Sequence, residues 1–282
     1  MIRIMCQGGL GNQLFTLNAA HILSKTYGVR VNLTFDAPNR HVDRPIQVGG
    51  LLNVCRHDLT ASYKSSLFRM CDLIDRTQNR FSPLGKLINL QTIFLDTHNL
   101  EAPLSLSTNP PNLVRGYFQN ANQVLRWLPS YSDEIYSFLD SIPMFSGLPM
   151  EYQAFHIRRG DYVANRDTLG ELEPEYYLNT RENSLPLIIT TDYSGPTENL
   201  QKFYPGAQII GPGDADVWTS FKILSRARKL TIANSTYSWW AGVLANGLEA
   251  EVVRPRQWNK IQTLSSEYLI HPQFREVENS FA

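Results

Sequence analysis

Residues 2–15 read Ile-Arg-Ile-Met-Cys-Gln-Gly-Gly-Leu-Gly-Asn-Gln-Leu-Phe, and they decide the fold of the first half of the chain. The apolar run at residues 2–6 predicts a strand, and a glycine loop separates it from apolar side chains that recur at helical spacing. Gly28 ends the helical pattern, and residues 31–35 form a second apolar run that is typical of a strand. This strand–loop–helix–strand unit predicts a parallel sheet with a right-handed crossover.

The α/β alternation resumes after residues 143–150, where two prolines and a glycine predict a linker. We therefore expect two Rossmann-like α/β domains with parallel sheets, at residues 1–147 and 148–282. The predicted strands after residue 36 lie at residues 92–95, 113–118, 152–157, 187–191, 207–210, 229–233 and 250–253. The predicted helices lie at residues 62–78, 121–142, 174–183, 196–203, 216–227 and 236–246, and Pro129 must kink or split the second of them.

The composition excludes several classes of protein. The 282 residues include 26 Lys plus Arg and 26 Asp plus Glu, so the formal net charge is zero. Hydrophobic residues make up 43%, which excludes a disordered chain. A protein that binds nucleic acid over a broad surface needs a surplus of Lys and Arg. The apolar runs are far shorter than the roughly 20 residues that span a bilayer. A local cluster of positive charge around one anionic ligand remains compatible with this balance.

The cysteines and the N-terminal residues indicate the compartment. Cys6, Cys55 and Cys71 form no disulfide framework, because their number is odd and no two have C-x-x-C spacing. Such a sparse set favours a reducing compartment. Residues 1–6 lead straight into the glycine loop and lack the basic and apolar regions of a secretory signal. We therefore expect a cytoplasmic protein.

The glycine loop at residues 8–13 is the first candidate binding motif. Glycines allow a ligand close to the backbone, and free N–H groups at a helix start attract anions. The spacing departs from the dinucleotide fingerprint, because Leu14 stands where that fingerprint has its third glycine. Asp36, after the second strand, would still imitate a ribose-binding acid. A nicotinamide-dependent oxidoreductase built on this unit is therefore an alternative interpretation.

The second motif, at residues 156–162, reads His-Ile-Arg-Arg-Gly-Asp-Tyr and follows a predicted strand. On a strand, His156 and Arg158 share one face, and Arg159 lies on the other. The planar guanidinium of arginine suits phosphate and stays charged at all relevant pH values. Asp161 can either orient an arginine or accept a proton. These side chains together indicate a site more strongly than any one of them.

Polar residues follow three further predicted strands. Residues 233–241 read Ala-Asn-Ser-Thr-Tyr-Ser-Trp-Trp-Ala, and hydroxyls at a helix start both cap the helix and accompany phosphate binding. Asp192 follows the strand at residues 187–191. Asp214 and Asp216 match the D-x-D pattern of metal-dependent glycosyltransferases, but we interpret them as acids favoured at a helix start. The sequence contains no set of residues with the spacing of a strong metal site.

Taken together, the three motifs resemble those of the alpha-1,2-fucosyltransferases. They occur in the order found in that family and extend from residue 8 to residue 240. The resemblance implies a GT-B-like fold in which two Rossmann-like domains with parallel sheets face a cleft. It also implies GDP-fucose as the donor substrate, inversion at the anomeric carbon, and no metal or other cofactor.

The resemblance assigns roles by position. Arg158 would contact the GDP diphosphate, and His156 would position the donor. Related fucosyltransferases place a carboxylate near the guanine, where this chain has Ser220, and Asp216 one turn earlier would substitute for it. The residues expected to contact the donor are Gly9, Gly11, Asn12, His156, Arg158, Asp192, Asp216, Asn234, Ser235 and Thr236. Those expected to act in catalysis are Asn12, His156, Arg158 and Asp161.

The family suggests transfer to the 2-hydroxyl of a terminal β-galactoside during synthesis of a bacterial surface glycan such as O-antigen. The partners expected are GDP-fucose and a galactose-terminated oligosaccharide, with residues 36–60 as the acceptor loops. We expect a bacterial cytoplasmic enzyme without an integral membrane segment, and peripheral membrane association stays open. Asp161 is either the base that deprotonates the acceptor or a residue that orients Arg158. A non-catalytic sugar-binding relative is the other alternative.

Overall fold

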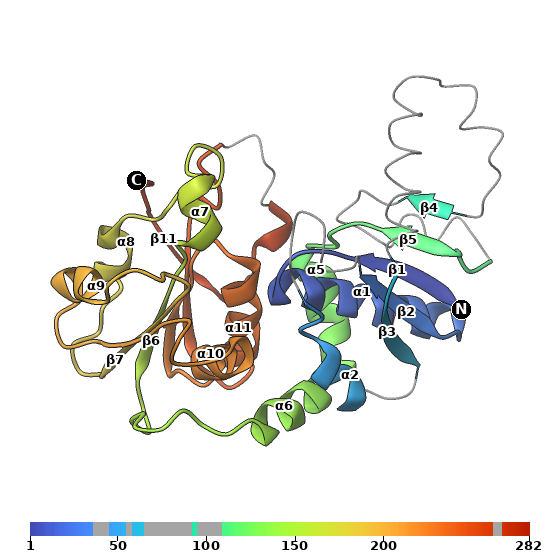
Figure 1. Cartoon of the computed structure of the whole chain (residues 1–282), viewed down its shortest axis with the longest axis horizontal. Coiled ribbons are helices and arrows are strands. Elements are labelled where there is room, and N and C mark those ends of the chain that lie inside the picture. The colour runs from blue at the N-terminus through green and yellow to red at the C-terminus, as the bar shows by residue number, and fades with distance from the viewer. Residues whose placement is uncertain (36–44, 55–57, 65–91, 95–108, 262–266) are drawn as a thin grey trace. The chain divides into compact units, whose positions relative to one another are not determined.

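The computed structural model describes residues 1–35, 45–54, 58–64, 92–94, 109–261 and 267–282 (Figure 1). The chain divides into two compact units, Met1–Phe138 and Leu139–Ala282. This division lies within helix α6 (Ser132–Ser141), ahead of the linker at which the sequence places the domain boundary. None of the described helices is long and apolar enough to cross a membrane.

The described strands of the first unit form a parallel sheet in the order β3-β2-β1-β5-β4. Helix α1 (Leu10–Tyr27) connects the first two strands and ends at Gly28, as the sequence predicts. Most of α1 is buried, so the sheet and this helix together form the core of the unit. The strands are β1 (Ile2–Cys6), β2 (Val31–Phe35), β3 (Leu59–Tyr63), β4 (Thr92–Phe94) and β5 (Leu113–Arg115).

Three predictions for the first unit have different outcomes in the structure. The predicted helix at residues 62–78 is wrong at its start, because β3 extends to Tyr63 and pairs with β2, and residues 65–78 lie outside the described ranges. A short helix, α2 (Gly49–Val54), lies within residues 36–60, the segment expected to form the acceptor loops. The predicted split at Pro129 is confirmed, because α5 (Ala121–Trp127) and α6 are separated by the 3-10 turn η2 (Leu128–Ser130).

The second unit contains a parallel sheet in the order β11-β10-β9-β6-β7-β8. Its strands are β6 (Gln153–Ile157), β7 (Leu187–Thr191), β8 (Gln208–Ile210), β9 (Lys229–Thr231), β10 (Glu251–Pro255) and β11 (Arg275–Val277). Apolar runs predict the first five, and β11 is an addition. The expectation of Rossmann-like parallel sheets in both halves, as a GT-B-like fold requires, is confirmed.

The helices of the second unit connect these strands (Figure 1). Helices α10 and α11 pack against each other, and Trp239 and Trp240 of α11 are fully buried. These tryptophans therefore belong to the core. The helices are α7 (Gly160–Ala164), α8 (Pro174–Leu178), α9 (Glu198–Phe203), α10 (Val217–Ser225), α11 (Thr236–Asn246) and the 3-10 turn η3 (Glu267–Leu269).

Candidate functional site

The second and third sequence motifs lie at the point where the strand order of the second sheet reverses. Strand β6 lies between β9 and β7, with β10 and β11 beyond β9 and with β8 beyond β7. Connections that leave the sheet at such a point run in opposite directions, and open α/β sheets bind ligands there, beyond the carboxyl ends of the strands. The residues that follow β6 and β9 are those of the two motifs, so the topology places them at one edge.

Two contacts join these motifs directly. The ring of His156, in β6, lies 5.2 Å from the ring of Tyr237 in the first turn of α11, measured between centroids. The hydroxyl of Tyr162, in α7, donates to the carbonyl of Asn234 at 2.7 Å. The turn after β6 and the N-terminus of α11 therefore form a single site within the second unit.

A carboxylate from the neighbouring strand organises the turn after β6. Arg158 Nη1 lies 2.5 Å from Asp192 Oδ2, and the two side chains are 18% and 25% exposed. Asp192 Oδ1 accepts from the backbone N–H groups of Arg159 and Gly160 at 2.7 and 2.9 Å. A Cβ on Gly160 would lie 2.4 Å from Asp192 Oδ2, so any larger residue at this position must displace the Asp192 carboxylate. Arg158 is held in place yet remains partly open to solvent.

His156 is a buried, neutral side chain. It is 3% exposed, and burial lowers its pKa to about 3, with a further lowering by the charge of Arg158 and an opposing effect of Asp192. Its Nδ1 has no hydrogen-bond partner among the described residues, and the same holds for Oγ1 of Thr190. The two residues are register partners in β6 and β7. Buried polar atoms normally have partners, so both atoms retain an unused capacity for hydrogen bonding.

The start of α11 carries the third motif. Ser235 is the N-cap residue, as expected, but its hydroxyl forms no capping hydrogen bond, so the expected side-chain cap is wrong. Thr236 is the first residue of the helix and is partly exposed. The Asn234 side chain is 2% exposed, and its amide donates to the carbonyls of Leu169, Gly170 and Trp258. In this structure Asn234 holds neighbouring loops together.

The acids before α10 have structural partners. Asp214 Oδ2 accepts from the N–H of Gly211 at 2.8 Å. Asp216 is the N-cap of α10 and accepts from the N–H of Thr219 at 2.7 Å. The interpretation as a helix-start residue is confirmed for Asp216, whereas Asp214 lies before the helix and closes the turn that follows β8. Ser220 lies in the next turn of α10, so Asp216 and Ser220 are separated by one turn as the sequence indicates.

The glycine loop occupies the corresponding position in the first unit. The order of that sheet reverses between β1 and β5, Gly9 is the N-cap of α1, and Gly11 lies in the first turn of that helix. Asn12 Oδ1 accepts from Gln119 Nε2 at 3.1 Å, so the segments that follow β1 and β5 are joined. Leu14 is 2% exposed and packs in the core. Of the other predicted residues, Asp36 lies outside the described ranges, and the side chain of Asp161, within α7, is not described.

No model of a known protein family matches the chain. The chain is 25% identical over 284 residues to the O-antigen biosynthesis glycosyltransferase WbnK of Escherichia coli, covering 89% of the chain and 92% of that protein. It is 29% identical over 130 residues to an alpha-1,2-colitosyltransferase of Escherichia coli, covering 39% of the chain and 42% of that protein. The chain is a relative of bacterial glycosyltransferases.

The resemblance of the motifs to those of the alpha-1,2-fucosyltransferases is confirmed. Both sequence relatives are glycosyltransferases, and colitose, the sugar named for one of them, is an analogue of fucose. Among solved structures, the heptosyltransferase WaaC of E. coli with ADP matches 98% of this chain and 92% of its own, with a TM-score of 0.49 and 11% identity. Neither of the two sequence relatives is an oxidoreductase, so they give no support to the alternative interpretation as a nicotinamide-dependent enzyme.

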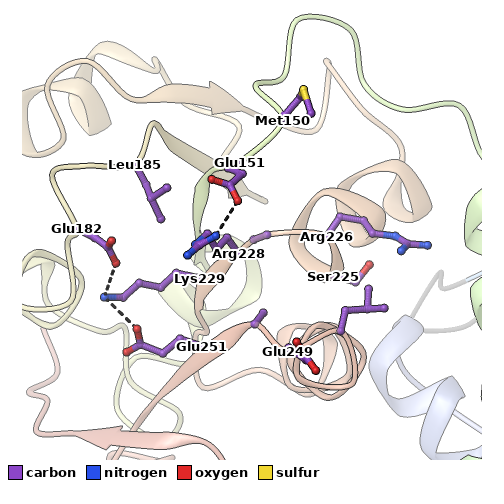
Figure 2. A pocket seen from close by; sticks show the side chains of 13 residues that line it. Met150, Glu151, Glu182, Leu185, Ser225, Arg226, Arg228, Lys229, Glu249 and Glu251 are labelled. Carbon is purple, nitrogen blue, oxygen red and sulfur yellow. Dashed lines mark hydrogen bonds and ion pairs between the residues drawn. The ribbon is translucent and has the colours of Figure 1, made fainter.

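A cavity of about 610 Å³ lies in the second unit, away from the motifs (Figure 2). Its lining includes the residues that begin β9 and β10, so it lies at the amino ends of the strands, opposite the motifs. Five of its charged side chains pair with one another, as the dashed lines in Figure 2 mark: Arg228 with Glu151, and Lys229 with Glu182 and Glu251. The first pair is separated by 2.7 Å and each of the other two by 3.4 Å. We therefore locate the candidate active site at the motif edge.

Two residues outside the predicted set of site residues, Glu171 and Gln13, organise the motifs. Glu171 lies 2.5 Å from Arg159 and has a side chain that is 9% exposed. Gln13 is fully buried beside the glycine loop. Its Nε2 donates to the carbonyls of Gly8 and Pro45, and its Oε1 accepts from the N–H groups of Gln47 and Val48. Only the position of Gln13 inside the motif hinted at its role. Among the described residues, no three His, Cys, Asp or Glu side chains gather as a metal site would require.

Proposed function

We propose that the chain is an inverting galactoside 2-alpha-L-fucosyltransferase, which moves L-fucose from GDP-fucose to the 2-hydroxyl of a terminal β-galactoside. The observation that carries this proposal is the junction of the second and third motifs. The contacts of His156 with Tyr237 and of Tyr162 with Asn234 bring an arginine-bearing turn to a helix N-terminus. Both features favour an anionic diphosphate, so their junction supports a nucleotide-sugar site.

Charge stabilisation is the main task of these residues in the proposed reaction. An inverting transfer displaces GDP in line from the anomeric carbon, and negative charge develops on the leaving diphosphate. Arg158 and the N–H groups at the start of α11 would stabilise this charge in a preorganised site. His156 is neutral near pH 7, because burial lowers its pKa to about 3, so it would hold the donor by a hydrogen bond. We propose that no metal or other cofactor takes part.

The acceptor hydroxyl must lose a proton, and Asp161 is the proposed base. A transition state with strong oxocarbenium character needs little assistance from a base, so an orienting role toward Arg158 is the other possibility. The substitution Asp161→Asn separates these roles when GDP affinity is measured alongside turnover. If Asp161 is the base, the variant loses turnover and keeps its affinity for GDP. If Asp161 orients Arg158, the variant loses both.

The remaining assignments rest on motif positions. Gly9, Gly11 and Asn12 keep their predicted role in donor binding, together with Asp192, Asn234, Ser235 and Thr236. Asp216 is proposed to reach the guanine, since it is exposed at the N-terminus of α10. The acceptor is proposed to meet residues 36–60, of which 36–44 and 55–57 lie outside the described ranges. The proposed place of action is the bacterial cytoplasm, in the synthesis of surface glycans.

The similarity to an alpha-1,2-colitosyltransferase favours a second candidate function. Colitose is an analogue of fucose, so a site that holds one sugar would need few changes to hold the other. Under this alternative, the chain transfers a colitosyl group with the same linkage. Parallel assays with the two nucleotide sugars distinguish the candidates by kcat/KM.

The central experiment offers GDP-fucose to a panel of galactosides, with and without EDTA, and maps the linkage of the product by NMR. We expect an alpha-1,2 linkage and a rate that EDTA leaves unchanged. A strict requirement for a metal ion would contradict the proposed mechanism. Thermal-shift measurements with GDP and NAD accompany the assay. Stabilisation by GDP without transfer to any acceptor would favour a non-catalytic sugar-binding relative, and stabilisation by NAD alone would favour an oxidoreductase.

A further inference from the structure

The second arginine of the motif is held by its own pair of residues. Arg159 Nε lies 2.5 Å from Glu171 Oε1, and Arg159 Cζ lies 4.9 Å from the centroid of the Tyr193 ring. Glu171 also pairs with Arg166 at 3.4 Å. We call Arg159, Glu171 and Tyr193 the Arg159 cluster. Tyr193 directly follows Asp192, so two consecutive residues after β7 hold the two consecutive arginines after β6.

The backbone around Glu171 is fixed by a segment distant in sequence. The N–H of Ala282 donates to the carbonyl of Glu171 at 2.8 Å, and the residue after it, Leu172, forms an antiparallel bridge with Phe281. On the other side of Glu171, Gly170 has a φ of +77°, and a Cβ there would lie 2.3 Å from the ring of Phe281. The carboxylate of Glu171 is therefore presented to Arg159 from an anchored loop.

Stability alone is a weak reason for such an arrangement. Desolvation of a carboxylate and a guanidinium offsets much of their attraction, so a buried ion pair is often no better than apolar residues of similar volume. Its geometric effect is larger, because arginine presents a rigid planar group that stacks on an aromatic ring and pairs with a carboxylate. The cluster thus fixes the orientation of Arg159.

The orientation of Arg159 is transmitted to Arg158. The N–H of Arg159 donates to Asp192 Oδ1, and the other oxygen of that carboxylate pairs with Arg158. Arg159 is thus held at its side chain by Glu171 and at its backbone by Asp192. A shift of Arg159 displaces the turn on which Arg158 is carried.

We propose that Glu171 is a positioning residue for the transfer reaction: through Arg159 it sets the orientation in which Arg158 meets the diphosphate of the donor. This inference rests on the proposed function of the site. Glu171 acts through another side chain, so its contribution is to the geometry of binding and turnover.

The test compares the wild-type protein with Glu171→Gln, which keeps the size of the side chain and removes its charge. We expect kcat/KM for GDP-fucose to fall by about 100-fold, the effect typical of a displacement of about 1 Å near the reacting groups. The Kd for GDP, measured by calorimetry, is expected to rise in the same variant. The matched control is Glu276→Gln, since Glu276 also pairs with two arginines, Arg254 and Arg256, at the β10–β11 edge. It is expected to keep wild-type turnover.

A double-substitution cycle separates positioning from a general structural role. If Glu171 acts through Arg159, then Arg159→Met and Arg159→Met/Glu171→Gln have the same residual kcat/KM, because coupled losses do not add. The comparison of these two variants also tests the proposal if Glu171→Gln alone does not fold. In the double variant both members of the ion pair are replaced, so the Arg159 guanidinium is not left without the Glu171 carboxylate.

The possible failures are distinguishable. Wild-type kcat/KM in Glu171→Gln, or additive losses in the double variant, would overturn the positioning role and leave the proposed function intact. A wild-type protein that neither binds GDP nor transfers fucose contradicts the proposed function, and the positioning role with it.

Discussion

Arg158 Nη1 lies 2.5 Å from Asp192 Oδ2, and this ion pair joins the ends of two adjacent parallel strands. The same carboxylate accepts from two backbone N–H groups of the turn, so Asp192 fixes both the side chain of Arg158 and the backbone that carries it. Arg158 therefore has a defined direction before any ligand arrives. Preorganised charge of this kind is what a developing negative charge on a leaving group requires.

Arg158→Ala is expected to lower kcat/KM for GDP-fucose by at least about 100-fold, the usual effect of removing one preorganised donor. The fold should persist, because Arg158 is partly exposed and Asp192 keeps its two backbone partners. Arg228→Ala is the control, since Arg228 forms an exposed pair with Glu151 at the opposite edge of the sheet. Steady-state kinetics and circular dichroism check both variants, and wild-type turnover in Arg158→Ala would disprove the phosphate assignment.

Gly160→Ala is expected to lower turnover because the added methyl group would lie 2.4 Å from Asp192 Oδ2. The carboxylate must move, and its contacts with Arg158 and the turn are lost together. Gly213→Ala serves as the control, since a Cβ at Gly213 meets nothing within 4 Å. Kinetic measurements on both variants give the comparison, and equal activities would show that the turn tolerates the displacement.

The stability of the protein should depend on the neutral state of His156. Its pKa falls from the ordinary 6.5 to about 3 on folding, mainly through burial, so the unfolded chain binds a proton that the folded protein does not. This contribution is fully present above pH 6.5 and is lost as the pH falls from about 6.5 toward 3. The loss approaches about 1.4 kcal/mol per pH unit for one such group.

His156→Gln is therefore expected to flatten the decrease in unfolding free energy between pH 6 and pH 4, as measured by urea denaturation. His271 has a pKa lowered to about 4 by burial and contributes with the same sign. His271→Gln should flatten the curve as well, and the double substitution should flatten it most. An unchanged slope in both single variants would show that neither imidazole is held neutral by the fold.

Gln13→Ala is expected to destabilise the first unit by roughly 3 kcal/mol, because buried backbone groups lose their hydrogen-bond partners. The substitution removes four hydrogen bonds, one with Gly8 in the glycine loop and three with residues 45–48. Gln201→Ala, at an exposed position on α9, is the control and should leave the melting temperature unchanged. Equal melting temperatures for the two variants would show that Gln13 does not anchor this loop.

Strongly apolar segments allowed much of the fold to be predicted from the sequence. The runs at β6 and β7 are buried along their whole length, and α11 carries its apolar side chains on nearly every face. The pattern fails where an element is short or partly exposed. Every residue of strand β3 is partly buried or exposed, and α7 has five residues, too few to establish a helical period.

The candidate site was predicted in part, because its motifs are local in sequence. Arg158 and His156 belong to one motif, and their neighbours after β9 and β7 follow from the rule that parallel strands end at a common edge. Glu171 could not be found in this way. It lies in a loop without periodicity, and its approach to Arg159 depends on hydrogen bonds with residues 280–282, far along the chain.

The reciprocal contacts between the ends of β6 and β7 also constrain how this sequence can change over evolutionary time. Arg158 pairs with Asp192 and Arg159 stacks on Tyr193, so a substitution at any of these four positions alters a contact of its counterpart. A change at one of them is most readily accommodated together with a change at the residue that it contacts. If the turn faces the donor phosphates as we propose, changes in the surrounding loops could alter the choice of sugar or acceptor while these contacts are retained.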